Sequence, residues 1–126
     1  MRQPSRARPD PLSEQRRSQP LEFFHNFLRT FYLDNTPDET LGLWRQQIYS
    51  TRFGSYAEDA LYVLDTILAD PPPDLIERLE EGGVTLFHRP DDFTLIPYTY
   101  EETVAWLREQ TEQFREAYEA FRRGSA

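Results

Sequence analysis

The sequence predicts a mainly α fold: a single-domain bundle of about five helices, with one irregular loop or short hairpin before a long last helix. Apolar residues recur at three- and four-residue steps in several segments that follow Leu21, which is the spacing of amphipathic helices. Three segments begin with a hydroxyl residue followed three positions later by glutamate, the capping box of a helix start. A chain of 126 residues has room for one hydrophobic core and not for two.

Residues 1–20 differ from the rest of the chain in charge and in apolar content. They hold five arginines against two acidic residues, four prolines, and only Met1, Ala7 and Leu12 as apolar side chains. Such a segment cannot bury enough apolar surface to offset the entropy that is lost on ordering. We therefore expect residues 1–20 to form a disordered basic arm and residues 21–126 to form the helical domain.

Two helices are predicted at the start of this domain. An aromatic-rich apolar stripe begins at Leu21 and predicts a helix that ends near Asp34. Thr36 and Glu39 then form a capping box around Pro37, which predicts the start of a second helix because proline is tolerated at the first helical position. The apolar stripes are Leu21, Phe24, Phe27, Leu28 and Phe31 in the first helix, and Leu41, Trp44 and Ile48 in the second.

Two more helices are predicted before residue 84. Ser55 and Glu58 form a second capping box, and the continuous apolar stripe that follows indicates a core helix. Asp70 and the three prolines after it stop this helix and allow a short fourth one, which ends at Gly82 and Gly83. The apolar positions are Ala57, Ala60, Leu61, Leu64, Ile67 and Leu68, and then Leu75, Ile76 and Leu79.

Residues 84–98 form the least regular segment. Two prolines lie near its apolar runs, so we expect a loop with some strand character, or a short hairpin, folded against the helices through its aromatic residues. Thr99 and Glu102 form the third capping box and open the longest helix, whose apolar seam has heptad spacing. The seam has few heptads and bulky aromatic occupants, so we expect it to pack within its own domain, in a monomer or a weak homodimer.

Few residues are candidates for catalysis. The chain has no cysteine, and His25 and His88 are its only histidines; no metal-binding, phosphate-binding or nucleophile motif occurs. Adjacent acidic residues such as Glu101 and Glu102 diverge by about 100° on a helix and do not form an acid–base pair. We therefore expect no enzymatic activity, no cofactor and no metal site. A metal-dependent enzyme that uses carboxylates and a histidine remains an alternative.

Acidic side chains are the main functional signal of the sequence. The net charge is −8, and residues 21–126 hold nine arginines against twenty acidic residues. Such a domain repels nucleic acid and anionic membranes and attracts basic proteins. No apolar run approaches the roughly 20 residues that cross a bilayer, and no apolar stretch follows the N-terminal arginines as it does in a secretory signal. We expect a cytoplasmic protein.

We expect the binding surface to lie on the fourth helix and in the irregular segment after it. The acidic residues there have little role in the predicted fold, and two aromatic residues accompany them. In an interface, the charges steer a basic partner and the aromatic rings supply the binding energy; the alternative is a surface that only keeps the protein in solution. The candidate residues are Glu77, Glu80, Glu81, Asp91 and Asp92 for steering, and Phe87 and Phe93 as anchors.

An ordered series of short motifs runs from about Leu21 to Phe114. It consists of Phe23-Phe24 with Phe31-Tyr32-Leu33-Asp34, then Ala60-Leu61 with Leu64-Asp65 and Leu68, then an acidic helix that ends in glycine, then Tyr100 ahead of Trp106-Leu107. In this order the chain resembles the small bacterial immunity proteins of contact-dependent growth inhibition systems. The resemblance implies a cytoplasmic helical protein that binds and neutralises the toxic C-terminal domain of an effector, often a nuclease, and it implies no cofactor.

The resemblance and the charge suggest one mechanism. A nuclease presents a positive groove to nucleic acid, so an acidic protein inhibits it by occupying that groove or a neighbouring surface. The alternative is a non-catalytic helical adaptor that binds another basic protein. In both cases the folded domain is not expected to bind nucleic acid or a membrane.

Overall fold

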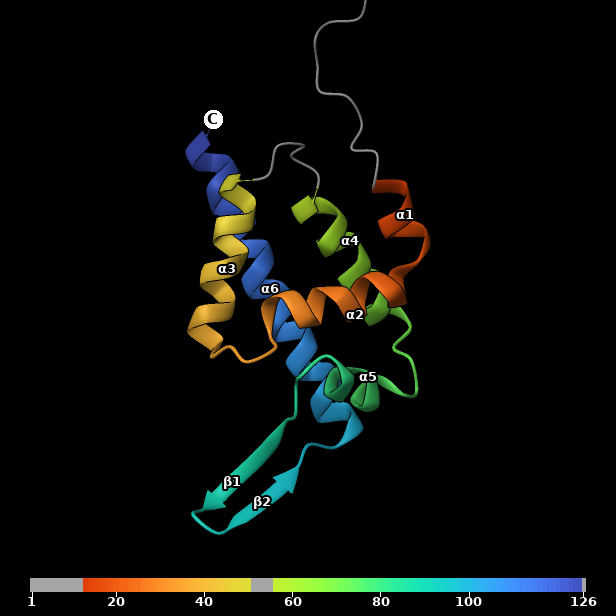
Figure 1. Cartoon of the computed structure of the whole chain (residues 1–126), viewed down its shortest axis with the longest axis vertical. Helices are drawn as coiled ribbons and strands as arrows, with labels where there is room; N and C mark the ends of the chain where they lie inside the picture. The colour runs from red at the N-terminus through yellow and green to blue at the C-terminus, as the bar shows by residue number, and fades with distance from the viewer. Residues whose placement is uncertain (1–12, 51–55, 126) are drawn as a thin grey trace, which may run out of the picture.

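The computed structural model describes residues 13–50 and 56–125, which form six helices and one two-stranded sheet (Figure 1). The fold is mainly helical, as predicted, with one helix more than expected because α1 precedes the predicted domain. The elements are α1 (Ser13–Ser18), α2 (Pro20–Phe31), α3 (Pro37–Ser50), α4 (Tyr56–Ala69), α5 (Leu75–Glu81), β1 (Phe87–Asp91), β2 (Thr94–Pro97) and α6 (Tyr100–Ser125).

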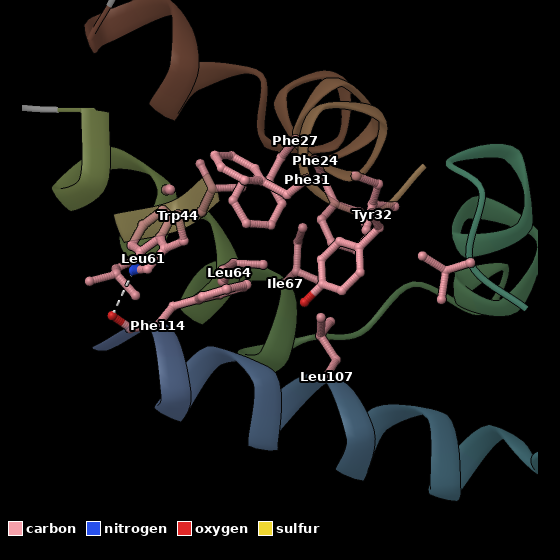
Figure 2. Packing of buried hydrophobic residues seen from close by; sticks show 14 of the residues in the cluster. Phe24, Phe27, Phe31, Tyr32, Trp44, Leu61, Leu64, Ile67, Leu107 and Phe114 are labelled. Atoms are coloured by element: carbon pink, nitrogen blue, oxygen red, sulfur yellow. Dashed lines mark hydrogen bonds between the residues drawn. The ribbon is translucent and has the colours of Figure 1, made fainter. Parts of the chain in front are cut away.

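The hydrophobic core lies between α2 and α6, with α3 and α4 beside them (Figure 2). An aromatic cluster forms its centre: the ring centroid of Phe27 lies 5.7 Å from that of Phe114, and Phe114 lies 4.9 Å from Trp44. The indole Nε1 of Trp44 donates a buried hydrogen bond to the carbonyl oxygen of Phe114 at 3.0 Å (Figure 2). Leu61, Leu64 and Ile67 of α4 belong to the same buried cluster, so the predicted stripes of α2, α3 and α4 meet in one core.

The apolar seam of α6 packs within its own domain. Leu107, Thr111 and Phe114 are buried against the bundle, and the hydroxyl of Thr111 is satisfied by the carbonyl oxygen of Leu107 at 2.8 Å. Trp106, one position before Leu107, is only half-buried and lies against the ring of Tyr32, 5.6 Å between centroids. The packing role expected of the heptad positions is confirmed.

Two of the three predicted capping boxes are observed as hydrogen bonds. The N–H of Glu39 donates to Oγ1 of Thr36 at 3.2 Å, and the N–H of Thr36 donates to Oε1 of Glu39 at 2.8 Å. Thr99 and Glu102 form the same pair of bonds at 3.1 and 2.8 Å. The start of the third box, Ser55, lies outside the described residues.

The expectation of a disordered arm is wrong for residues 13–20, which form α1, the N-cap of α2 at Gln19 and the first residue of α2, Pro20. α1 buries none of its side chains, so apolar burial does not hold it in place. Instead, Ser13, Arg16 and Arg17 donate hydrogen bonds to the carboxylate of Asp59 in α4, at 2.8, 3.0 and 2.6 Å. Asp59 is fully buried, and these bonds replace its lost hydration. Residues 1–12 lie outside the described part of the chain.

The irregular segment forms a hairpin that projects away from the helical bundle (Figure 1). β1 and β2 pair antiparallel, with a register shift between His88 and Asp91. Every residue of both strands is exposed, so the expected folding against the helices is wrong for the hairpin, whereas Val84 and Leu86 before it do pack on the core. The backbone groups that face the other strand pair across the hairpin and the remaining ones face water, so the hairpin needs no contact with the bundle to satisfy them. Among the described residues, no helix combines the length and the apolar character needed to cross a membrane.

Candidate functional site

The position of α5 follows from the sequence on either side of it. Leu75 and Leu79 are buried and hold the helix on the bundle. At its end, the N–H of Val84 donates to the carbonyl oxygen of Leu79 at 2.8 Å, and the N–H of Gly83 donates to that of Glu80 at 3.0 Å. This is a Schellman motif with Gly83 at φ +95°. It confirms the predicted glycine stop and directs the chain into the hairpin.

The three glutamates of α5 are exposed, as predicted, but they do not converge. Glu80 lines a hollow between α5 and the base of the hairpin, whereas Glu81 lines a separate hollow beside His25 and Arg78. Glu77 lines neither of these. The split follows from helix geometry, because consecutive side chains on a helix point in directions about 100° apart.

The hollow beside Glu80 has one wall from the hairpin. Phe87 is paired with Pro97 across the strands, so both lie on the same face of the hairpin, and Leu95 lies on that face because side chains alternate along a strand. All three line the hollow, which has a volume of about 260 Å³. Leu79 and Leu86 contribute apolar side chains from the bundle side. The predicted residues Glu80 and Phe87 are therefore brought together.

The other predicted hairpin residues lie at the tip, at the far end of the hairpin from α5 (Figure 1). The carboxylate of Asp91 accepts hydrogen bonds from the N–H of Phe93 at 2.8 Å and from the hydroxyl of Thr94 at 3.2 Å. The first of these bonds is the main reason why the pKa of Asp91 lies below its usual value. Asp91 thus shapes the turn, contrary to the expectation that it has little structural role. Asp92 is exposed, and the ring of Phe93 is 96% exposed.

The hairpin carries most of the exposed apolar side chains in the described part of the chain. Of the five large hydrophobic residues that are exposed there, four belong to the hairpin: Phe87, Phe93, Leu95 and Ile96. Sequence reasoning missed Leu95 and Ile96, because it placed the segment against the helices. The signal that identifies them is the pairing of two short runs across the turn at residues 91–94, which leaves a two-stranded sheet with no third element to cover it.

The charge of the chain is concentrated around the same elements. Residues 74–102 hold eight acidic residues and two arginines, and one of those arginines, Arg78, is paired with Asp74 at 2.8 Å. The side chains of Glu77, Glu80 and Glu81 have no hydrogen-bond or ion-pair partner among residues 13–50 and 56–125. We refer to α5 and the hairpin, residues 75–81 and 87–97, as the α5–hairpin surface.

The base of the hairpin is tied to α6 by a polar contact. Nε2 of His88 lies 2.9 Å from Oε2 of Glu102, and the imidazole ring stacks on Tyr98 with 4.5 Å between centroids. Arg89 lies over the ring of Phe87, 5.8 Å from its centroid. These contacts orient the face of the hairpin that lines the hollow.

Within the described ranges, no group of three or more histidine, cysteine, aspartate or glutamate side chains is arranged to hold a metal ion. Comparison of the chain with protein-family models, with curated proteins and with solved structures finds no match.

Proposed function

We propose that this protein is an immunity protein, which binds the toxic C-terminal domain of a contact-dependent growth inhibition effector, or of a related bacterial effector, through the α5–hairpin surface. The observation that carries the proposal is the coincidence of exposed apolar side chains with unpaired carboxylates at one end of the molecule. The resemblance of the motif order to immunity proteins supports the choice of a toxin as the partner.

The two kinds of side chain serve different steps of binding. The carboxylates of Glu77, Glu80 and Glu81 raise the encounter rate with a positively charged partner. Phe87 and Phe93 then lose their contact with water, and buried aromatic side chains supply most of the binding energy in protein interfaces. A surface that only kept the protein in solution would have no need of the aromatic side chains.

Inhibition follows from occupation of the surface that the toxin needs. A toxin that cleaves nucleic acid must hold phosphates with basic side chains, and the same side chains attract the carboxylates of the α5–hairpin surface. The bound protein then excludes the substrate without doing any chemistry. This mechanism requires no cofactor and no catalytic residue in the chain.

A non-catalytic adaptor for another basic protein uses the same surface and is distinguished by its partner. Such an adaptor binds a protein of the host cell and gives no protection against a toxin. No arrangement of described residues favours the metal-dependent enzyme considered from the sequence.

The test begins with a search of the neighbouring genes for a large secreted effector, followed by co-expression of this chain with the C-terminal domain of that effector. We expect the chain to restore growth and to form a complex that elutes as one species in gel filtration. A triple variant, Glu77→Lys, Glu80→Lys and Glu81→Lys, should lower the affinity about tenfold or more and reduce its dependence on salt, because it reverses the steering charge.

The matched control is Glu109→Lys, Glu116→Lys and Glu119→Lys on the exposed side of α6, which changes the net charge by the same amount. It should leave the affinity within about threefold of the original. Failure to restore growth would overturn the immunity function. Equal loss of affinity in both triple variants would show that total charge, and not the α5–hairpin surface, attracts the toxin.

A further inference from the structure

We infer that the hollow between α5 and the hairpin base is a subsite for one basic side chain of the partner, an arginine, whose methylene groups contact the apolar walls and whose guanidinium pairs with Glu80. This inference rests on the proposed function, because it names how a basic partner is recognised at the same surface. It follows from the size, the lining and the charge of the hollow.

The size of the hollow suits a side chain. Its volume is about 260 Å³, whereas sites for drug-sized ligands occupy roughly 300–1,000 Å³. It is lined by residues of α5, the hairpin and the start of α6, and by the segments that join the hairpin to the two helices. A single long side chain is therefore the better match.

The lining selects the chemistry of that side chain. Leu79, Leu86, Leu95 and Pro97 form apolar walls, and Glu80 is the one residue with a charged side chain among those that line the hollow. Long basic side chains have the complementary pattern, an apolar stem that packs against hydrophobic surface and a charged head. An apolar side chain would fill the walls but would leave the carboxylate of Glu80 unpaired.

Phe87 favours arginine over lysine. Its ring is among the side chains that line the hollow. A planar guanidinium stacks on an aromatic ring and binds a carboxylate through two N–H groups, whereas an ammonium does neither. The neighbouring carboxylates of Glu77 and Glu81 add attraction for any cation but do not line this hollow.

The experiment uses the full chain, labelled with 15N, and three small probes: the N-acetyl methylamides of arginine, lysine and norleucine. We expect the arginine probe to shift the amide resonances of residues 79–87 and 95–98 with saturation in the millimolar range. The lysine probe should bind about threefold to fivefold more weakly. The norleucine probe, which keeps the apolar stem and lacks the charge, should give no saturable shift.

Two neighbouring substitutions provide the variant and its control. Glu80→Gln keeps the shape of the side chain and should weaken the arginine probe about threefold to fivefold. Glu81→Gln removes the same charge from the next residue, which lines a different hollow, and should weaken the arginine probe clearly less than Glu80→Gln does. Both positions are exposed, so both variants should fold. Leu95→Ala, also at an exposed position, should weaken the probe by removing part of one wall.

Several results would overturn the inference. Equal binding of the norleucine probe would assign the hollow to an apolar anchor. Equal effects of Glu80→Gln and Glu81→Gln would show attraction by general charge. The amide resonances of residues 79–87 could also shift when the protein concentration is raised without a probe. That result would assign the hollow to a second copy of the chain.

These experiments distinguish failure of the arginine subsite from failure of the proposed immunity function. If the triple charge reversal abolishes toxin binding but Glu80→Gln leaves it unchanged, the immunity function stands and the arginine subsite is wrong. If the arginine probe binds as described but the chain gives no protection, the subsite stands and the partner is another basic protein.

Discussion

Glu102 joins the hairpin to α6, because its Oε2 lies 2.9 Å from Nε2 of His88 while its Oε1 accepts the N–H of Thr99 at 2.8 Å. One carboxylate thus completes the capping box of α6 and holds the base of β1. The hairpin has few other contacts with the bundle, so this carboxylate orients the wall of the hollow that Phe87 and Leu95 form.

The first prediction concerns the pH dependence of this junction. The N–H of Thr99 and, next, the contact with His88 hold the pKa of Glu102 below its ordinary value of 4.5. A carboxyl whose pKa is lowered by folding stabilises the protein above its unfolded pKa, and this contribution is lost as the pH falls through the lower, folded value. We expect stability from Glu102 to be complete at neutral pH and to decline below about pH 4.5.

Carboxyl NMR shifts measure this pKa directly. His88→Phe keeps a ring to stack on Tyr98 and removes the polar contact, so it should raise the pKa of Glu102 part of the way toward 4.5. Glu102→Gln should remove the corresponding part of the acid sensitivity of unfolding by urea. A pKa of 4.5 or above for Glu102 in the original protein would contradict the prediction.

The second prediction concerns the attachment of α1. Asp59→Ala removes the buried carboxylate that Ser13, Arg16 and Arg17 share. Breaking a buried pair costs about 3–5 kcal/mol, but Arg17 is partly exposed and regains hydration, so we expect a loss of about 2–3 kcal/mol in urea unfolding. Amide hydrogen exchange in residues 13–18 should also become faster.

Asp65→Ala is the control for that experiment. It removes a carboxylate of the same helix that is paired at the surface with Arg115, at 2.6 Å, and exposed pairs contribute about 0.2–1 kcal/mol. If the two variants lost equal stability, the buried ion cluster would not be what holds α1 in place.

The third prediction concerns the central indole. Trp44→Phe leaves the carbonyl oxygen of Phe114 without its buried donor and opens space in the aromatic cluster, so we expect a loss of about 2–3 kcal/mol. Trp106→Phe, at a half-buried position, should cost less than about 1 kcal/mol. Urea unfolding monitored by circular dichroism compares both. A smaller effect at Trp44 than at Trp106 would contradict the described core.

The fourth prediction concerns two glycines with opposite roles. Gly83 has φ +95°, and a Cβ atom there would lie 3.1 Å from Cα of Leu33, so Gly83→Ala should destabilise the fold by about 1–2 kcal/mol. Gly42 lies inside α3 and faces open space where a Cβ atom would lie, so Gly42→Ala should stabilise the fold by up to about 1 kcal/mol. Thermal unfolding gives the sign of each change. The same sign for both would refute the backbone argument.

Local sequence patterns predicted the features whose partners lie within a few residues. The capping boxes at Thr36 and Thr99 and the Schellman turn at Gly83 are held by hydrogen bonds that span three to five positions, and the residue types alone indicate them. The apolar stripes likewise indicated which face of each helix is buried. For residues 84–98 the sequence predicted either a loop or a short hairpin. It did not predict the direction in which the hairpin projects.

The errors fall where the stabilising partner is distant in the chain. The residues of α1 that bind Asp59 lie 42 to 46 positions away from it, and nothing local distinguishes them from arginines of a disordered arm. The predicted site residues lie apart in the structure for a related reason, because their positions depend on the tertiary arrangement. Glu80 and Phe87 meet across a hollow, Glu81 lines a different one, and Asp92 and Phe93 lie at the hairpin tip, because helix rotation and strand length set these positions.

The sequence by itself determined the helical class, most helix boundaries and the sign of the surface charge, because these depend on the residue types within a few turns of chain. Only the tertiary structure decided that α1 docks on a buried carboxylate, that the hairpin stands clear of the bundle, and which acidic residue shares a hollow with exposed apolar side chains. Those outcomes depend on which distant segments lie together, and packing of the whole core sets that arrangement.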